Sequence, residues 1–267
     1  MAREWAFDSP HATRFTEARI RFLNTWLPGL IDLQGLRTAF DAGCGVGHLS
    51  RYLADLGLEV VAIDGRPGNI LEAQRRHPQV RFLVHNMEAP AIRELGVFDL
   101  VLCFGLLYHL ENPFAGVRNL YSLAGKVLLV ESMVVPGSSP IAGLVDEGQG
   151  EDQSLYSAAL VLSQPCLVKM LYHVGFPFVY ATRDLPDHED FRESSVSSQK
   201  RTVLLAARIP LQLTRLVLLP EPSTRDPWRK HSVWRAERFR SFLRKPWRQK
   251  VATLYRKMGR FVDHQCS

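Results

Sequence analysis

The sequence predicts an α/β fold in which helices flank a mostly parallel sheet. Segments typical of strands and of helices alternate from residue 38 to residue 135, which is the pattern of a doubly wound sheet. Residues 58–63 are nearly all apolar, as expected for a strand that is buried on both faces. A glycine-rich turn follows the first expected strand, and in such folds this turn brings the main chain close to a ligand.

Each element follows from a local pattern. Residues 11–34 place apolar side chains close to one helical face, and we expect Pro28 and Gly29 to end or break this helix. Apolar runs bounded by turn residues predict strands at residues 37–43, 58–65, 80–86, 98–104, 125–135, 177–185 and 200–208. Helical periodicity predicts helices at residues 47–57, 68–78, 113–124 and 165–176.

One internal segment, residues 136–164, has weak periodicity and is rich in glycine, serine and acidic residues. A long irregular segment inside a compact domain is often a lid or a binding loop, and we expect this one to be a lid over the substrate that accepts the reaction. The chain is therefore expected to divide into a helical cap (residues 1–37), a ligand-binding domain (residues 38–210) and a tail (residues 211–267).

The positive charge of the chain is concentrated in its tail. The net charge is +6, and 46% of the 267 residues are hydrophobic, so a sizeable core is expected and global disorder is not. Residues 221–267 hold 13 Lys/Arg against 4 Asp/Glu, a net charge of +9, which leaves −3 for residues 1–220. The basic balance therefore does not indicate a nucleic-acid surface over the main domain.

Cysteine usage and the N-terminus indicate a reduced, cytoplasmic protein. The first ten residues lack the apolar run of a signal peptide, and no stretch reaches the roughly 20 apolar residues of a membrane helix. The cysteines lie far apart and show no metal-ligand spacing, so we expect no metal. They are Cys44, Cys103, Cys166 and Cys266.

The glycine turn stands at the centre of a larger constellation. Glycines occupy the alternate positions 43, 45 and 47 behind Asp41, whereas the dinucleotide fingerprint spaces its glycines G-x-G-x-x-G. Asp64 ends the second expected strand, where a carboxylate can accept hydrogen bonds from both hydroxyls of a ribose. Simpler roles stay open, because Asp41 also suits a turn and Asp64 also suits a helix cap.

This glycine spacing resembles motif I of the class I methyltransferases that use S-adenosylmethionine. The resemblance implies a Rossmann-like, seven-stranded, mostly parallel sheet. It also implies that Asn86, after the third strand, receives the adenine amino group and that Met87 covers the ring, although Asn86 is also an ordinary turn residue. The donor carries no phosphate, so bare glycines rather than a lysine suit its amino-acid part. The expected donor-binding residues are Asp41, Gly43, Cys44, Gly45, Asp64, Gly65, Asn86, Met87 and Phe104.

Three later segments resemble a narrower group, the tRNA wobble-uridine carboxymethyltransferases and their relatives. The segments are FGLLYHLENP, LSQPCLVKMLYHVGF and KRTVLLAAR. The resemblance implies that Tyr108 and Arg201 hold the carboxylate of a modified donor, as a guanidinium in a pocket can. The chain departs from that group at residues 164–166 and in having only about 37 residues before the sheet. We therefore expect the ordinary methyl donor and a different acceptor.

His109 is the candidate general base, because it follows the strand that ends beside the donor and an imidazole titrates near neutrality. Tyr108 and His109 are the expected catalytic residues, and both are expected to bind substrate together with Arg201. A loop-shaping role for His109 and a surface charge at Arg201 stay open. The acids of the 136–164 segment either line the acceptor pocket or, as we favour, lie in solvent; they are Asp146, Glu147, Glu151 and Asp152.

The tail interleaves three tryptophans with many arginines, and its apolar residues repeat at helical spacing. It either packs on its own domain or a second subunit, or rests on an anionic membrane surface, or contacts nucleic-acid phosphates, and we favour these in that order. The expected function is S-adenosylmethionine-dependent methylation of oxygen or nitrogen on a small molecule or a glycan- or lipid-linked acceptor. Transfer RNA modification and a donor-binding protein without catalysis are the alternatives.

Overall fold

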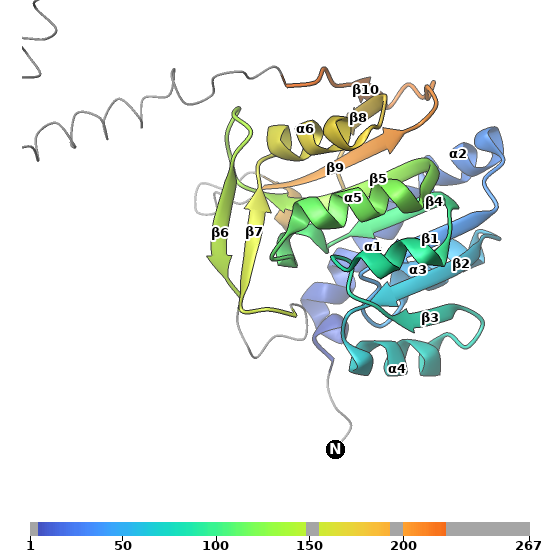
Figure 1. The fold of residues 1–267 in the computed structure, drawn as a ribbon. Coiled ribbons are helices and arrows are strands. Elements are labelled where there is room, and N and C mark those ends of the chain that lie inside the picture. Colours follow the sequence, from blue (N-terminus) through green and yellow to red (C-terminus); the bar gives the residue numbers. More distant parts are fainter. Residues whose placement is uncertain (1–4, 148–154, 193–199, 223–267) are drawn as a thin grey trace, which may run out of the picture. The chain divides into compact units, whose positions relative to one another are not determined.

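An eight-stranded sheet forms the centre of the protein in the computed structural model, which describes residues 5–147, 155–192 and 200–222 (Figure 1). The strand order is β10-β8-β9-β5-β4-β1-β2-β3. Strands β5, β4, β1, β2 and β3, which are neighbours in this order, pair in parallel. Strands β9, β8 and β10 pair antiparallel with their neighbours. The strands are β1 (Thr38–Ala42), β2 (Glu59–Asp64), β3 (Arg81–Val84), β4 (Phe98–Phe104), β5 (Ala124–Val134), β8 (Phe178–Thr182), β9 (Lys200–Ala207) and β10 (Leu216–Leu218). The expected mostly parallel sheet is confirmed.

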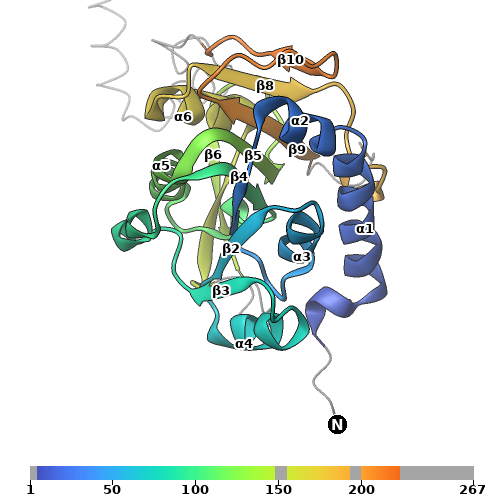
Figure 2. The same cartoon turned by 90° about the vertical axis from the view of Figure 1, so that its right-hand side faces the viewer.

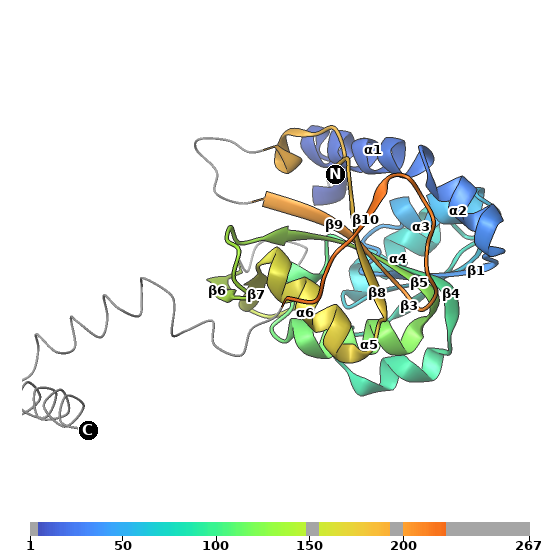
Figure 3. The ribbon, with the colours of Figure 1, turned by 90° about the horizontal axis from the view of Figure 1, so that it is seen from above.

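Helices cover both faces of this sheet (Figures 2 and 3). One hydrophobic core packs α1, α2, α3 and α4 against the sheet, and a second core packs α5 and α6 against the opposite face. Side chains alternate between the two cores along each strand, so Ala39 lies in the first and Phe40 in the second. The helices are α1 (Pro10–Asn24), α2 (Leu27–Gln34), α3 (His48–Asp55), α4 (Pro67–Arg76), α5 (Pro113–Leu123) and α6 (Gln164–Val174).

The helix starts follow from local sequence. Asn112 caps α5 by accepting a hydrogen bond from the main-chain N–H of Ala115 at 3.0 Å, and Ser163 caps α6 in the same way. Proline follows each cap within the first turn, where its missing N–H costs nothing. These caps fix where each helix leaves the carboxyl edge of the sheet or returns to it.

The expected helix at residues 11–34 is two helices, and it breaks earlier than the sequence predicts. The chain turns at Thr25 and Trp26, between α1 and α2. Pro28 and Gly29 lie inside the first turn of α2. Proline is well tolerated there because the first N–H groups of a helix have no intrahelical partner. A proline near the middle of a helical pattern therefore marks a helix start here.

The segment at residues 136–164 is not irregular throughout, because it contains a β-hairpin. Strands β6 (Ala142–Asp146) and β7 (Ala158–Leu162) pair antiparallel as a separate two-stranded sheet. Leu160 N donates to Leu110 O at 3.0 Å, which ties the hairpin to the turn after β4. The sequence of β6 does not alternate between apolar and polar residues, because an exposed position of this strand holds the apolar Leu144.

The sheet also continues past residue 210, where the tail was expected to begin. β10 pairs antiparallel with β8, so the sheet has eight strands where the resemblance implied seven, and the compact unit reaches Pro222. Residues 223–267 of the expected amphipathic helical tail, residues 211–267, lie outside the described residues. Among the described helices, none is both long enough and apolar enough to cross a membrane.

Candidate active site

The glycine turn lies at the carboxyl edge of the sheet, between β1 and α3. Gly43, Gly45 and Gly47 have φ values of 77°, 56° and 89°, which side-chain-bearing residues rarely adopt. A Cβ atom at Gly45 would lie 2.8 Å from the ring of Phe7, and one at Gly43 would lie 3.0 Å from Leu106. Both the backbone conformation and the available space therefore require glycine at these positions.

Main-chain hydrogen bonds attach this turn to the end of β2. Gly43 N and Cys44 N both donate to Ile63 O, at 2.9 and 2.8 Å. Gly45 N donates to Asp64 Oδ2 at 3.0 Å, and Arg66 N donates to Asp64 Oδ1 at 2.8 Å. Burial raises the pKa of Asp64, and these N–H groups act in the opposite direction. The turn and the Asp64 carboxylate thus form one rigid unit.

Asp41 lies beneath the turn and is almost completely buried. Ser50 Oγ donates to Asp41 Oδ2 at 2.6 Å, which links β1 to α3. Burial raises the pKa of Asp41 from its ordinary value of 3.8 to about 6. Asp41 and Gly45 do not line either cavity at this edge, so they act from below the surface of the site.

A narrow cavity of about 30 Å³ lies beyond Asp64. Leu155 narrows this cavity, since a Cβ atom at Gly65 would collide with its side chain. The neighbouring Tyr156 hydroxyl accepts a hydrogen bond from Asn86 Nδ2 at 3.0 Å. The lining includes the expected donor residues Gly43, Asp64, Gly65, Asn86 and Met87. The segment that begins at Leu155 therefore covers this end of the site.

A larger cavity of about 280 Å³ shares Gly43, Asp64 and His109 with the narrow one. Its wall combines aromatic side chains with charged ones. The aromatic members are Phe7, Phe15, Phe104 and Tyr108, and the polar members include Arg19, His109, Asp190 and Arg201. Cys44 also lines this cavity. The structure thus brings the expected residues of the glycine turn, of the β4 edge and of β9 together around one space.

A buried ion pair network lies in the wall of the larger cavity. Glu131 is fully buried in β5, and Arg201 Nη1 donates to its Oε1 at 2.9 Å. Arg19 of α1 donates to the other carboxylate oxygen of Glu131. Arg201 also lies 3.3 Å from the Tyr108 hydroxyl. Arg201 is therefore not a surface charge, and a buried ion pair of this kind depends on both of its partners.

The sequence analysis did not single out Arg19 or Glu131. Arg19 occupies an ordinary helical position whose burial depends on the docking of α1. Glu131 gives a usable signal, because it interrupts an apolar run that is otherwise typical of a fully buried strand. A charged residue at such a position requires a partner of opposite charge.

His109 pairs with an acid from the hairpin segment. His109 Nδ1 lies 3.0 Å from Glu147 Oε1, and the two side chains are 9% and 11% exposed. His109 ends the short helical turn Leu107–His109 (η3), and Glu147 follows β6. Glu147 is thus a buried partner, contrary to the solvated position we favoured for it. Asp146 is exposed as expected, whereas Glu151 and Asp152 lie outside the described residues.

The residues at this edge fit a sulfonium nucleoside donor. The turn has no side chains of its own at Gly43 and Gly45, and the partly buried carboxylate of Asp64 ends β2, where a ribose can bind. Among the residues that the structure describes, no lysine lines either cavity, and the donor has no phosphate to bind. The fit lies in the chemical nature of these residues. The volume of the narrow cavity, where the nucleoside would lie, is limited by Leu155.

Comparison with known proteins agrees with this arrangement. A family model described as a methyltransferase domain matches residues 40–126. The ubiquinone biosynthesis O-methyltransferase of Xanthomonas euvesicatoria pv. vesicatoria (strain 85-10) is 33% identical over 166 residues, which cover 55% of this chain and 66% of that protein. Its counterpart in Xanthomonas oryzae pv. oryzae (strain PXO99A) is 32% identical over 162 residues, with the same coverage. The chain thus spans just under two thirds of these relatives.

Solved structures share the fold. The N-terminal domain of EvdMO1 with bound S-adenosylhomocysteine aligns with a TM-score of 0.59 at 21% identity, covering 74% of this chain and 84% of that one. Magnesium protoporphyrin IX methyltransferase (ChlM) from Synechocystis PCC 6803 with bound S-adenosylmethionine aligns with a TM-score of 0.52 at 20% identity, covering 75% and 85%. Together with the glycine turn, these likenesses lead to one conclusion: residues 40–126 match a methyltransferase domain, and the chain has the fold of these S-adenosylmethionine- and S-adenosylhomocysteine-bound structures.

Proposed function

We propose that the protein transfers the methyl group of S-adenosylmethionine to a hydroxyl oxygen of a small molecule, with His109 as the general base. The single observation that carries this proposal is that His109 lines both cavities while its Nδ1 lies 3.0 Å from Glu147 Oε1. A carboxylate on one ring nitrogen orients an imidazole so that the other nitrogen can accept a proton. The O-methyltransferase names of the curated relatives favour oxygen over nitrogen.

The proposed step is an in-line displacement. The bound donor supplies an activated methyl group on its sulfonium. The acceptor oxygen forms a bond to the methyl carbon, the carbon–sulfur bond breaks, and its electron pair remains on sulfur. His109 takes the proton of the acceptor hydroxyl, and Glu147 stabilises the imidazolium that results. The chain otherwise contributes alignment, for which the rigid unit of the glycine turn and Asp64 is suited.

Donor binding is assigned to the residues around the narrow cavity. We propose that Asp64 accepts from the ribose hydroxyls, that Asn86 receives the adenine amino group and that Met87 packs on the ring. Gly43, Cys44 and Gly45 are assigned to the amino-acid part, with Asp41 beneath them. The two glycines add no side chain there, and the side chains of Leu106 and Phe7 lie against them. Gly65, which lines the narrow cavity, and Phe104, which lines the larger cavity, are the remaining proposed donor-binding residues.

Arg201 and Tyr108 are proposed to bind an acidic group of the acceptor. Arg19 and Arg201 share the single carboxylate of Glu131, so Glu131 balances only one of the two positive charges. Asp190 lies farther away, 4.0 Å from Arg201 Nε, and is partly exposed. A guanidinium beside a phenol hydroxyl suits a carboxylate or a phosphate. The aromatic wall of the cavity suits an acceptor with an apolar body.

Modification of tRNA is a second candidate. The approach of Arg201 to Tyr108, at 3.3 Å, favours it, because the resemblance to the wobble-uridine enzymes assigns a donor carboxylate to that pair. The basic tail would then contact RNA phosphates. A tail that contacts a membrane surface or a second subunit agrees with the first function. A donor-binding protein without catalysis is the third reading, and the continuity of the two cavities at His109 argues against it.

The test separates these functions. The full chain is incubated with methyl-labelled S-adenosylmethionine and either a small-molecule extract or a purified tRNA fraction, and the products are identified by mass spectrometry. A labelled small molecule that is absent with His109→Ala supports the first function, and labelled nucleoside supports the second. If S-adenosylhomocysteine binds in a calorimeter while neither fraction gains label, the protein binds the donor without transferring its methyl group.

A further inference from the structure

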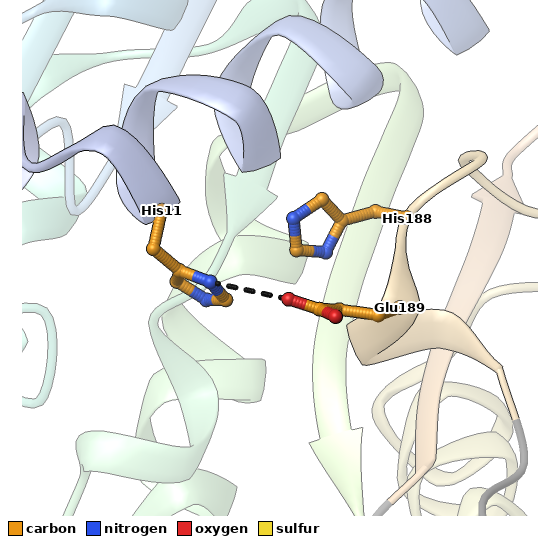
Figure 4. A group of neighbouring side chains, drawn as sticks. All are labelled: His11, His188 and Glu189. Atoms are coloured by element: carbon orange, nitrogen blue, oxygen red, sulfur yellow. Dashed lines mark ion pairs between the residues drawn. The ribbon is translucent and has the colours of Figure 1, made fainter.

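A second cluster of polar side chains lies at the mouth of the larger cavity. His11 belongs to the first turn of α1, and His188 and Glu189 belong to the segment that forms η4 (Glu189–Phe191). Each residue offers one ligand atom, and these three atoms lie within 4.8 Å of one another. Figure 4 shows the two imidazole rings and the carboxylate gathered between α1 and this segment.

His188 is buried, with 8% of its surface exposed. Its Nδ1 accepts a hydrogen bond of 3.2 Å from the main-chain N–H of Asp190 and lies 4.0 Å from Asp190 Oδ2. Its ring meets that of His11 edge-on, at 5.1 Å between centroids. A buried imidazole with one long hydrogen bond and two carboxylates nearby has the environment of a metal ligand rather than that of a core residue.

The ring of His11 lies between two carboxylates. Its Nδ1 is 3.6 Å from Glu189 Oε1, and its Nε2 is 3.3 Å from Asp190 Oδ2. A histidine that ligates a metal through one nitrogen usually gives the other N–H to a carboxylate, which fixes the ring. His11 can thus ligate through Nδ1 beside Glu189 while Asp190 holds Nε2.

The distances suit a small cation with nitrogen and oxygen ligands. Zinc bonds of about 2.0–2.1 Å in a tetrahedron place the ligand atoms roughly 3.3–3.4 Å apart. The 3.6 Å between His11 Nδ1 and Glu189 Oε1 exceeds this by little. All three ligand atoms lie within 4.8 Å of one another, so side-chain rotations have to close the remaining distance to His188. Neutral imidazole and carboxylate are ligands that zinc-class ions accept, whereas magnesium prefers oxygen alone.

We propose that His11, His188 and Glu189 bind one zinc-class divalent cation, with Asp190 orienting His11. Three protein ligands leave a fourth position for a water or an acceptor oxygen. Because His11 and Asp190 also line the larger cavity, the bound cation fastens α1 to the η4 segment at the cavity wall. The sequence analysis expected no metal because the cysteines show no metal-ligand spacing, and it did not consider these histidines. This inference does not depend on the proposed methyl transfer.

The test measures cation binding directly. The full chain is stripped of metal with a chelator, then titrated with Zn²⁺ in a calorimeter and with Co²⁺ by visible absorption, which reports the ligand geometry. We expect His11→Ala to weaken Zn²⁺ binding at least a hundredfold. The His11 side chain is 53% exposed, so this variant should fold. His188→Asn is the second ligand variant, and exposed His173 on α6 gives the matched control His173→Ala.

The outcomes decide the proposal. Zn²⁺ that raises the unfolding temperature of the wild type and of His173→Ala, but not of His11→Ala, supports it. Histidines in residues 223–267 remain in every variant, so binding there appears equally in all of them. Equal Zn²⁺ affinity in the wild type and His11→Ala overturns the proposal, as does the absence of Zn²⁺ binding tighter than millimolar. In that case the cluster serves only as ordinary ion pairs between α1 and η4.

Discussion

The narrow cavity and the larger cavity form the two ends of one site, and different kinds of contact hold each end together. At the narrow end, main-chain N–H groups of Gly43, Cys44 and Gly45 lock the turn onto β2, and the cavity measures about 30 Å³. At the wide end, charged and aromatic side chains from α1, β4, η3 and β9 line a cavity of about 280 Å³. Glu131 of β5 and Glu147 next to β6 pair with members of this lining. The first end depends on backbone geometry, and the second on side-chain pairing.

This difference separates two tasks. A main-chain cradle tolerates few substitutions and offers the same shape in any chain that forms the turn, so it suits a common donor. A network of ion pairs changes with each substitution, so it suits an acceptor that differs between enzymes. Changes at the wide end should alter turnover and acceptor choice, whereas changes at the narrow end should alter donor affinity and stability.

The largest expected effect is that of His109→Ala at the wide end. Loss of a general base lowers turnover by roughly 10²- to 10⁴-fold. Donor affinity should change little, because His109 is assigned to the acceptor proton. Single-turnover rates and calorimetry with S-adenosylhomocysteine measure the two quantities separately, with His173→Ala as control. Equal losses in turnover and in donor affinity would contradict a catalytic role for His109. They would also contradict the assignment of turnover to the wide end and of donor affinity to the narrow end.

The next effect is the pH dependence of stability at the narrow end. Burial holds the pKa of Asp41 at about 6 in the folded protein, against 3.8 ordinarily, so the folded state binds the proton more tightly. This contribution is fully present below pH 3.8 and is lost as pH rises through about 6, a change of about 3 kcal/mol in the free energy of unfolding. Urea titrations between pH 4 and pH 7 measure it.

Asp41→Asn removes the titrating group and provides the comparison. Its unfolding free energy should lack the fall that the wild type shows across this pH range. Parallel pH profiles for the two proteins would mean that Asp41 does not bind a proton more tightly in the folded state.

A smaller effect is expected at the wide end for Glu147→Gln. Glu147 is assigned as a positioning residue that acts through His109, and a hydrogen bond to a charged group contributes roughly 1.5–3 kcal/mol, or about ten- to hundredfold in kcat. The KM for the donor should stay unchanged, and Glu147→Asp should recover part of the rate. The exposed neighbour gives the control Asp146→Asn. A Glu147→Gln enzyme with wild-type kcat would show that the pair only shapes the loop.

The smallest expected effect is that of Gly45→Ala, compared with Gly57→Ala. Both glycines have positive φ, at 56° and 84°, so each alanine costs roughly 1–2 kcal/mol of backbone strain. Only at Gly45 does the new Cβ also meet a neighbour, the ring of Phe7, whereas Gly57 has open space. Donor affinity should therefore fall about tenfold for Gly45→Ala alone. Equal donor affinities in the two variants would contradict a main-chain cradle.

The sequence by itself determined the parallel sheet and the narrow end of the cleft. Strands β1 to β5 are apolar runs separated by amphipathic helices, so local patterns suffice to predict them. Gly43, Asp64 and Asn86 each follow a strand within a short stretch of chain, and the carboxyl ends of parallel strands meet at one edge. Their positions in the sequence therefore predict their proximity.

Only the tertiary structure decided which partners the charged residues of the wide end have. Glu131 meets Arg19 and Arg201 through the docking of α1 and the antiparallel pairing of β9 with β5, which no local pattern encodes. Strand β6, which precedes Glu147, has no buried side chain, and β10 is too short to show a period. Side-chain pairs between distant segments depend on how the elements pack, because a charge at one position is compatible with many partners until packing selects one.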